Sequence, residues 1–189
     1  KQQGIKKGDE IDLKEQDNSL LVSKEKSQEL KKLTINLSEV KEIYARVIIC
    51  SFNAGYDEIK IKFSTNNEIE KIQETIREKL WNVIIKEIDK ESITLGRLHK
   101  DGSEEFDIAL KRFFIIINNI AHETLDAFEK NDYDWLKRIV LIKEEPDKLS
   151  RYLRRGINLK LDINFPRTGP LYALIEMIID TAHKYREIC

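Results

Sequence analysis

The sequence predicts an α+β fold: a β-hairpin remnant, then a small α/β layer in the order β-α-β-α-β-β, then an antiparallel three-helix bundle. Alternating apolar and polar residues mark short strands up to about residue 98, with helical patterns between them. From Ser103 the strand signals stop and long helical patterns follow. Only seven glycines and three prolines occur among 189 residues, and 35% of the residues are charged, which favours helices over disorder.

These changes along the chain divide it into four predicted segments. A partial hairpin covers 1–23, a linker covers 24–32, the α/β domain covers 33–100 and the helical bundle covers 103–189. The linker reads KEKSQELKK and has no apolar stripe.

The hairpin is predicted from two short runs of strand-forming residues. Ile11 and Leu13 alternate with Asp12 and Lys14, and a second strand covers 20–22. Because two short strands are only marginally stable in water, the hairpin is expected to belong to something larger or to a partner chain. The chain starts without Met, so we expect it to be part of a longer protein.

The α/β domain combines strand alternation with signals for helix ends. Ser38 is placed to cap the first helix and Gly55 to end it, and Thr65 and Glu68 have capping-box spacing before the second helix. The expected elements are a strand at 33–37, a helix between Ser38 and Gly55, a strand at 59–63, a helix at 65–80, and strands at 83–88 and 92–98.

The bundle is predicted as three helices. The first covers about 104–129, the second runs from Tyr133 to Gly156 with a kink or restart at Pro146, and the third opens at Gly169-Pro170. The residues expected to face inward are Phe106, Leu110, Phe113, Ile117, Ile120 and Phe128, then Leu136, Val140, Leu149 and Leu153, then Leu171, Leu174, Ile175, Ile178 and Ala182.

Charge and hydropathy exclude some classes of protein. The 33 Lys and Arg residues balance 34 Asp and Glu residues, so the whole chain has no general attraction to nucleic acid or to an anionic membrane. No run approaches the ~20 apolar residues that a spanning helix needs. We therefore expect a cytoplasmic protein without membrane insertion.

Two groups of charged residues are candidates for a site. Glu176 and Asp180 lie four residues apart on one helical face and, with a third or fourth acid from a neighbouring helix, could ligate a metal ion. Such a pair is also common on solvated helices in a chain with 34 acids.

The second group is basic. Glu144, Glu145 and Asp147 precede Arg151, Arg154 and Arg155, a separation of charge that fits either the helix dipole or a docking surface for an acidic partner, phosphate groups or nucleic acid.

The motifs of common enzyme classes are missing from the sequence. His122 and Glu123 begin an H-E-x-x-D string that lacks the second imidazole of a zinc-protease site, and the glycines form neither a phosphate loop nor a dinucleotide motif. The sequence therefore predicts no enzyme, with a metal-dependent hydrolase as an alternative of another class.

Several segments resemble known regulator families. GIKKGDEIDLKEQDNSLLVS resembles the second half of an AbrB-type swapped-hairpin domain. LYALIEMIID-TA and EEPDKLSRYLRR resemble helices of PhoU domains. With YARVIICSFNAGYDEIKI between them, the order is similar to archaeal phosphate uptake regulators that join an AbrB-like segment to PhoU repeats.

The PhoU resemblance implies a cytoplasmic adaptor that acts on a phosphate ABC transporter or a phosphate-signalling protein and is commonly a homodimer. It also implies a possible iron or zinc site, because the family uses E/D-x-x-x-D motifs that Glu176 and Asp180 match, with Asp147 as the matching acid of the second helix. Met177, Thr181 and Lys143 depart from that pattern and weaken one half of the metal cage. The AbrB resemblance implies, as an alternative, a DNA-binding transcriptional regulator, although the basic first hairpin that binds DNA is missing from this chain.

Overall fold

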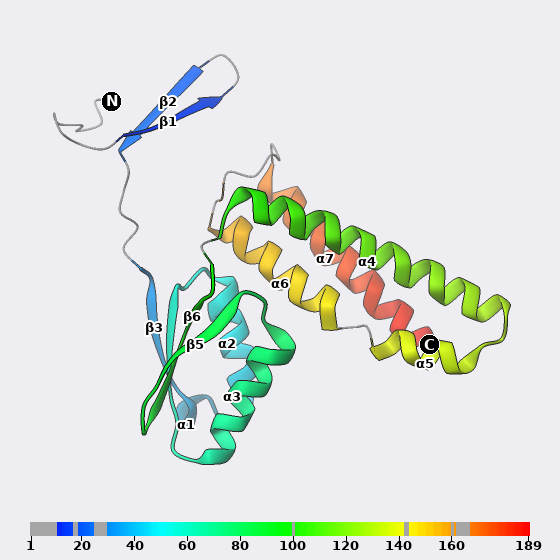
Figure 1. Ribbon diagram of the computed structural model, residues 1–189, viewed down its shortest axis with the longest axis horizontal. Helices are drawn as coiled ribbons and strands as arrows, with labels where there is room; N and C mark the ends of the chain where they lie inside the picture. The colour runs from blue at the N-terminus through cyan, green and yellow to red at the C-terminus, as the bar shows by residue number, and fades with distance from the viewer. Residues whose placement is uncertain are drawn as a thin grey trace. The chain divides into compact units, whose positions relative to one another are not determined.

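The computed structural model describes residues 11–16, 19–24, 30–99, 101–141, 144–159, 161 and 167–189 (Figure 1). Contacts divide the chain into two compact units, Lys1–Leu30 and Lys31–Cys189. The division falls inside the predicted linker at 24–32.

The first unit contains the predicted hairpin. Strands β1 (Ile11–Gln16) and β2 (Ser19–Lys24) pair antiparallel, with Leu13 opposite Val22.

The second unit begins with a four-stranded mixed sheet, and its element order confirms the β-α-β-α-β-β prediction. Strand β3 (Lys32–Asn36) pairs parallel with β4 (Glu58–Lys62), which pairs antiparallel with β6 (Ser92–Arg97), and β6 pairs antiparallel with β5 (Val83–Ile88). The order across the sheet is therefore β3-β4-β6-β5. The helices between β3 and β4 provide the crossover that a parallel pair requires.

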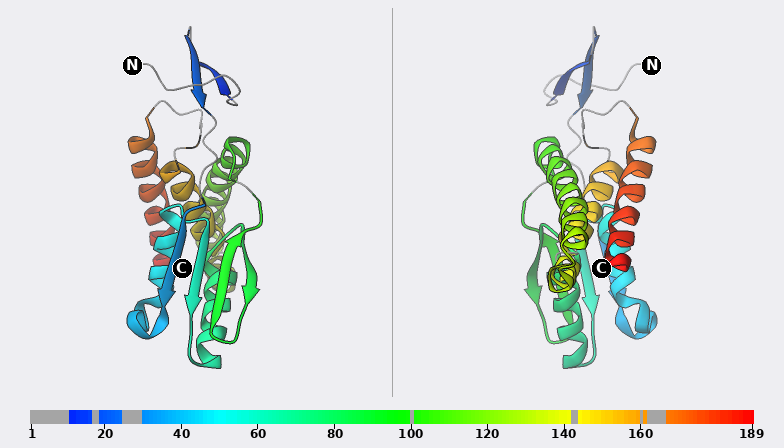
Figure 2. Two further views of the ribbon diagram at one scale, coloured as in Figure 1. Left: turned by 90° about the vertical axis from the view of Figure 1, so that its left-hand side faces the viewer. Right: turned by 90° about the vertical axis from the view of Figure 1, so that its right-hand side faces the viewer.

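Helices cover one face of this sheet (Figure 2). They are α1 (Leu37–Val40), the 3-10 turn η1 (Lys41–Ile43), α2 (Tyr44–Asn53) and α3 (Asn66–Lys79). Along β4, Ile59 and Ile61 are buried while Lys60 and Lys62 are exposed. The alternation in the sequence thus corresponds to a covered face and an open face.

The helix ends are set by local side chains, one of them different from the prediction. Asn36, not Ser38, caps α1, because its Oδ1 accepts a hydrogen bond of 3.3 Å from the Ser38 amide. Gly55 follows the end of α2 with a φ of 89°, a conformation that glycine adopts without strain.

The capping box of α3 is confirmed. Thr65 accepts a hydrogen bond from the Glu68 amide, and the Glu68 carboxylate accepts hydrogen bonds from the amides of Ser64 (2.7 Å) and Thr65 (3.0 Å). These bonds lower the pKa of Glu68, with the Ser64 amide as the largest cause.

The C-terminal region contains four described helices where three are predicted. They are α4 (Ser103–Glu129), α5 (Tyr133–Leu141), α6 (Glu144–Asn158) and α7 (Thr168–Ile188). The predicted second helix is two helices, and Pro146 lies in the first turn of α6, where its missing N–H costs no helical hydrogen bond. In Figure 1, α6 runs opposite to α4 and α7, which is the predicted antiparallel arrangement.

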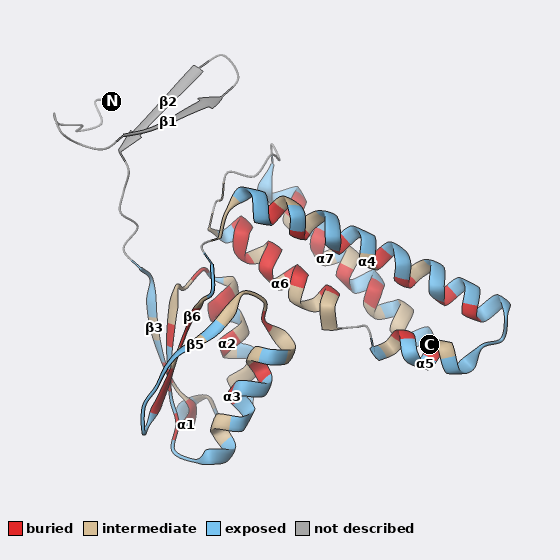
Figure 3. Ribbon diagram, viewed as in Figure 1, coloured by how far each residue is buried: buried red, intermediate tan, exposed pale blue. Residues whose placement is uncertain are grey.

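One hydrophobic core joins the sheet, its helices and the helical region (Figure 3). It includes Ile61 from the sheet and Phe113 and Leu153 from the helices. The predicted boundary near residue 100 therefore marks a change of architecture within one compact unit. Two residues expected to face inward are exposed: Phe128 by 44% and Leu174 by 38%. Among the described residues, the helices are too short or too polar for any of them to cross a bilayer.

Candidate functional site

The candidate site lies along the contact between α6 and α7, where charged side chains pair in a regular register. Arg154 Nη1 lies 2.8 Å from Glu176 Oε1, and Asp147 Oδ1 lies 2.9 Å from His183 Nε2. On each helix the two paired residues are seven residues apart, which is about two helical turns. The second pair therefore repeats the first along the two antiparallel helices. The segments EEPDKLSRYLRR and LYALIEMIID are thereby placed side by side.

At one end, Asp147 accepts contacts from two residues of α7. Its side chain is 19% exposed, and Arg186 Nη1 lies 4.0 Å from its second oxygen. Because an ionised carboxylate only accepts hydrogen bonds, the 2.9 Å contact requires His183 Nε2 to carry a hydrogen. Asp147 lies in the first turn of α6, where the helix dipole also favours a negative charge.

At the other end, Arg154 is held by its own helix. Its Nε donates to the Ser150 carbonyl (3.1 Å) and its Nη2 donates to Ser150 Oγ (2.9 Å). The short contact with Glu176 is an ion pair without hydrogen-bond geometry, since the buried Glu176 Oε1 has no hydrogen-bond partner among the described residues. Ser150 therefore fixes the direction in which Arg154 approaches α7.

Arg151 ties α6 to the α/β layer. Its Nη1 donates a 3.0 Å hydrogen bond to the carbonyl of Lys79, the last residue of α3. The carbonyls at a helix end have no partner within the helix, so an arginine donor there is favourable. Burial lowers the pKa of the Arg151 guanidinium, and the nearby Asp147 partly opposes that effect.

Arg155 is inside the protein, which corrects its predicted place on a docking surface. Its side chain is 0% exposed, and its Nε donates a 2.9 Å hydrogen bond to Asp101. Its Nη1 donates to the carbonyls of Phe52 (2.7 Å) and Tyr56 (2.8 Å), and the guanidinium carbon lies 4.7 Å from the centre of the Phe52 ring. The Arg155 guanidinium therefore binds other parts of the same chain and does not face a partner.

A second arginine and a second aspartate, both partly exposed, join Arg155 and Asp101 in one cluster. Arg97 lies 2.7 Å from Asp57 and 2.9 Å from Asp101, and Arg155 Nη2 lies 3.5 Å from Asp57. Two positive and two negative side chains therefore balance each other between the sheet and α6. This balance reduces the cost of burying the charges.

The three predicted metal ligands do not converge. Glu176 pairs with Arg154, Asp147 with His183, and the exposed Asp180 with Lys184 of the next turn at 3.0 Å. Within the described ranges, no three His, Cys, Asp or Glu side chains gather as a metal site would require. As arranged, this donor set does not fit a metal ion, and the iron or zinc site stays a prediction.

Sequence reasoning missed the Arg97–Asp57–Asp101–Arg155 cluster, although one signal for it exists. Asp57 directly precedes β4 and Asp101 follows β6, and the start of β4 lies beside the end of β6 because Glu58 pairs with Gly96. The two acids meet only once the strand order is known.

Comparison of the chain with protein-family models, with curated proteins and with solved structures gave no match.

Proposed function

We propose that the protein is a regulator of phosphate uptake, a cytoplasmic adaptor of the PhoU type that acts on a phosphate ABC transporter or a phosphate-signalling protein. The observation that carries this proposal is the register between α6 and α7. The two segments that resemble PhoU helices are neighbours, and their charged residues pair across the contact as Arg154 with Glu176 and Asp147 with His183. The α+β architecture with a C-terminal helical region is compatible with this proposal.

The register suggests what the charged residues of these motifs do. Arg154 and Asp147 orient α7 against α6, so their effect on a partner is indirect. On the outer side of α7, Met177 is 69% exposed and Leu174 is 38% exposed among the described residues. In this proposal the pairs hold α7 in place, and its outer side meets the transporter or signalling protein.

A genetic experiment tests the function. We expect deletion of the gene to change phosphate uptake and transporter expression between phosphate-rich and phosphate-poor media. Arg154→Glu should fail to complement the deletion because it places two acids together, and Arg154→Glu combined with Glu176→Arg should complement. Arg138→Glu, an exposed arginine on α5, is the matched control and should complement. Uptake and expression unchanged by the deletion would contradict the proposal.

The metal prediction has a separate test. Metal binding at Glu176 and Asp180 requires Arg154 and Lys184 to leave the carboxylates. Zn²⁺ or iron occupancy, measured by elemental analysis after dialysis, should therefore increase in Arg154→Gln and disappear in Glu176→Ala/Asp180→Ala. Equal occupancy in these variants and the unchanged protein would show that the residues are not ligands.

DNA binding is the second candidate function, and the separate hairpin unit favours it. Strands β1 and β2 pair only with each other among the described strands, and such a hairpin needs further pairing or packing to be stable. Swapped hairpins of the AbrB type obtain this from a second chain. Binding to duplex DNA that weakens steeply with salt would support this candidate, and its absence at low salt would remove it.

A further inference from the structure

The outward side of α4 carries three exposed apolar residues on one line, which no described element covers. Ile108, Ile115 and Leu125 are 56%, 59% and 56% exposed. Spacings of seven and ten residues are sums of alternating steps of three and four, so these side chains lie on one line along the helix. The complete line, here called the α4 stripe, consists of Ile108, Lys111, Ile115, Asn118, His122, Leu125 and Glu129.

The α4 stripe is distinct from the buried side of the same helix. The buried side includes Phe106, Phe113 and Ile120, which contribute to the cores beneath α4. Single exposed apolar residues are ordinary on protein surfaces. Three of the seven positions of the α4 stripe are apolar, and the steps of three and four residues that relate all seven positions over most of this 27-residue helix are those of a surface that packs against another helix.

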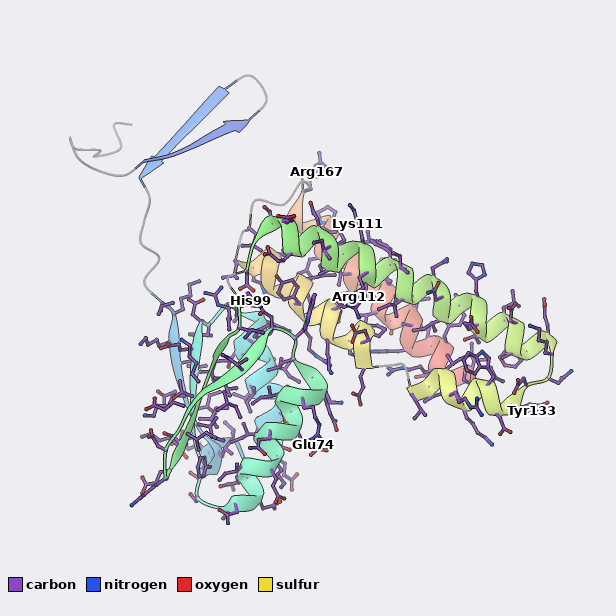
Figure 4. The ribbon with its side chains drawn as sticks, viewed as in Figure 1. Glu74, His99, Lys111, Arg112, Tyr133 and Arg167 are labelled. Carbon is purple, nitrogen blue, oxygen red and sulfur yellow. The ribbon has the colours of Figure 1, made fainter. Side chains whose placement is uncertain are left out.

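Two charged residues of the stripe indicate which helix packs against it. Lys111 lies near the start of α4 and Glu129 is its last residue (Figure 4 marks Lys111). Neither side chain forms an ion pair or a hydrogen bond with another described residue, whereas the neighbouring Arg112 pairs with Glu145 of α6 at 2.7 Å. Lys111 near the start of the stripe and Glu129 at its end thus carry charges of opposite sign that no described residue pairs with.

We propose that the α4 stripe binds the same stripe of a second copy of this chain, with the two α4 helices antiparallel. A twofold axis next to residue 120 places Lys111 opposite Glu129, Ile115 opposite Leu125 and Asn118 opposite His122. Between Lys111 and Glu129 this register matches opposite charges at both ends, apolar residues next to them and polar residues at the centre, while Ile108 lies outside the paired segment.

A parallel pairing is disfavoured by the same residues. It sets Lys111 against Lys111 and Glu129 against Glu129, so that like charges meet at both ends. The antiparallel arrangement is the self-complementary one, and it makes the interface isologous. This inference rests on α4 alone and does not depend on the proposed role in phosphate uptake.

Charge exchange tests both the surface and its direction. We expect sedimentation equilibrium of the full chain to give twice the chain mass at protein concentrations up to about 100 μM. Such concentrations are needed because an interface of modest area binds weakly. Lys111→Glu should weaken the dimer roughly tenfold or more, since the repulsive pair occurs twice by symmetry. Lys111→Glu combined with Glu129→Lys should restore it, a result that only the antiparallel arrangement gives.

An apolar variant with a matched control completes the experiment. Ile115→Glu should give a monomer, while Ile88→Glu, at an isoleucine of β5 that is 58% exposed, should leave the dimer intact. Far-UV circular dichroism checks that each variant is folded. A monomeric unchanged protein overturns the proposal, as does a dimer that Ile115→Glu and Lys111→Glu leave unaffected. If the double variant does not regain the dimer, the antiparallel direction is wrong.

Discussion

Arg155 donates a 2.9 Å hydrogen bond to Asp101 although their side chains are only 0% and 1% exposed. Nη1 of Arg155 donates to the carbonyls of Phe52 and Tyr56, at the end of α2 and just after it, while Nη2 has no hydrogen-bond partner among the described residues. One side chain of α6 thereby contacts the α/β layer and the segment that leads into α4. This contact is a physical reason why residues 31–189 form a single compact unit.

We predict that Arg155→Met lowers the free energy of unfolding by about 3 kcal/mol, because it leaves Asp101 buried with only Arg97 as a positive partner. Urea unfolding followed by circular dichroism measures the change. Arg138→Met, at an exposed arginine of α5, is the control and should change stability by less than about 0.5 kcal/mol. A loss below about 1 kcal/mol for Arg155→Met would show that the cluster contributes little.

The comparison of sequence and structure shows which features local patterns determine. The strand at Val83–Ile88 and the capping box at Thr65 follow from residues close together in the chain, and both were predictable. The burial of Arg155 was not, because it depends on Asp57 and Asp101, which reach α6 only through the strand order.

The candidate site was predictable only in part, for the same reason. The spacing of Glu176 and Asp180 places them one turn apart on one helix, but it does not reveal that Arg154 and Lys184 occupy their carboxylates. The cation that pairs with Glu176 comes from another helix, at a position set by the antiparallel register of α6 and α7. Ion pairs between two elements can be predicted only when the packing of those elements is known.

We predict a loss of stability at high pH that depends on Tyr152. Tyr152 is 3% exposed, and its ring packs edge-on against Trp81 with centroids 4.9 Å apart. Burial, together with the charges of Asp101 and Glu105, raises the pKa of Tyr152 to about 12.

The unfolded chain releases the Tyr152 proton near its ordinary pKa of about 10, whereas the native state retains it, so rising pH favours unfolding between these values. The free energy of unfolding should fall by up to about 1.4 kcal/mol per pH unit in that window relative to Tyr152→Phe. Urea unfolding at pH 9 to 12 measures the difference. Tyr133→Phe, at a 66% exposed tyrosine, should follow the unchanged protein. Parallel curves for the protein and Tyr152→Phe would contradict the prediction.

We predict an acid-dependent contribution from Glu58. Hydrogen bonds from Lys32 and then Lys86, at 2.8 and 2.7 Å, lower the pKa of Glu58 to about 2. The unfolded chain takes up the proton near pH 4.5, so the stabilisation is present above that pH and is lost as pH falls towards 2. Screening at the surface keeps it below about 1 kcal/mol.

Urea unfolding from pH 6 down to 2 should therefore show a steeper decline in the unchanged protein than in Glu58→Gln. Glu87→Gln, at an exposed residue of β5, is the control and should decline like the unchanged protein. An equal decline in Glu58→Gln would mean that the two lysines do not hold the carboxylate in solution.

We predict that Thr65→Ala lowers the free energy of unfolding by about 1 kcal/mol, because the Glu68 amide loses its side-chain acceptor at the start of α3. Thr65→Ser retains the hydroxyl and should remain within about 0.5 kcal/mol of the unchanged protein. Thermal unfolding of the three proteins at pH 7 measures both changes. α3 packs against α6, and Lys79 at its end accepts the hydrogen bond from Arg151, so the loss should appear as reduced stability of the whole unit. If Thr65→Ser destabilises as much as Thr65→Ala, the methyl group of Thr65 and not its hydroxyl is responsible.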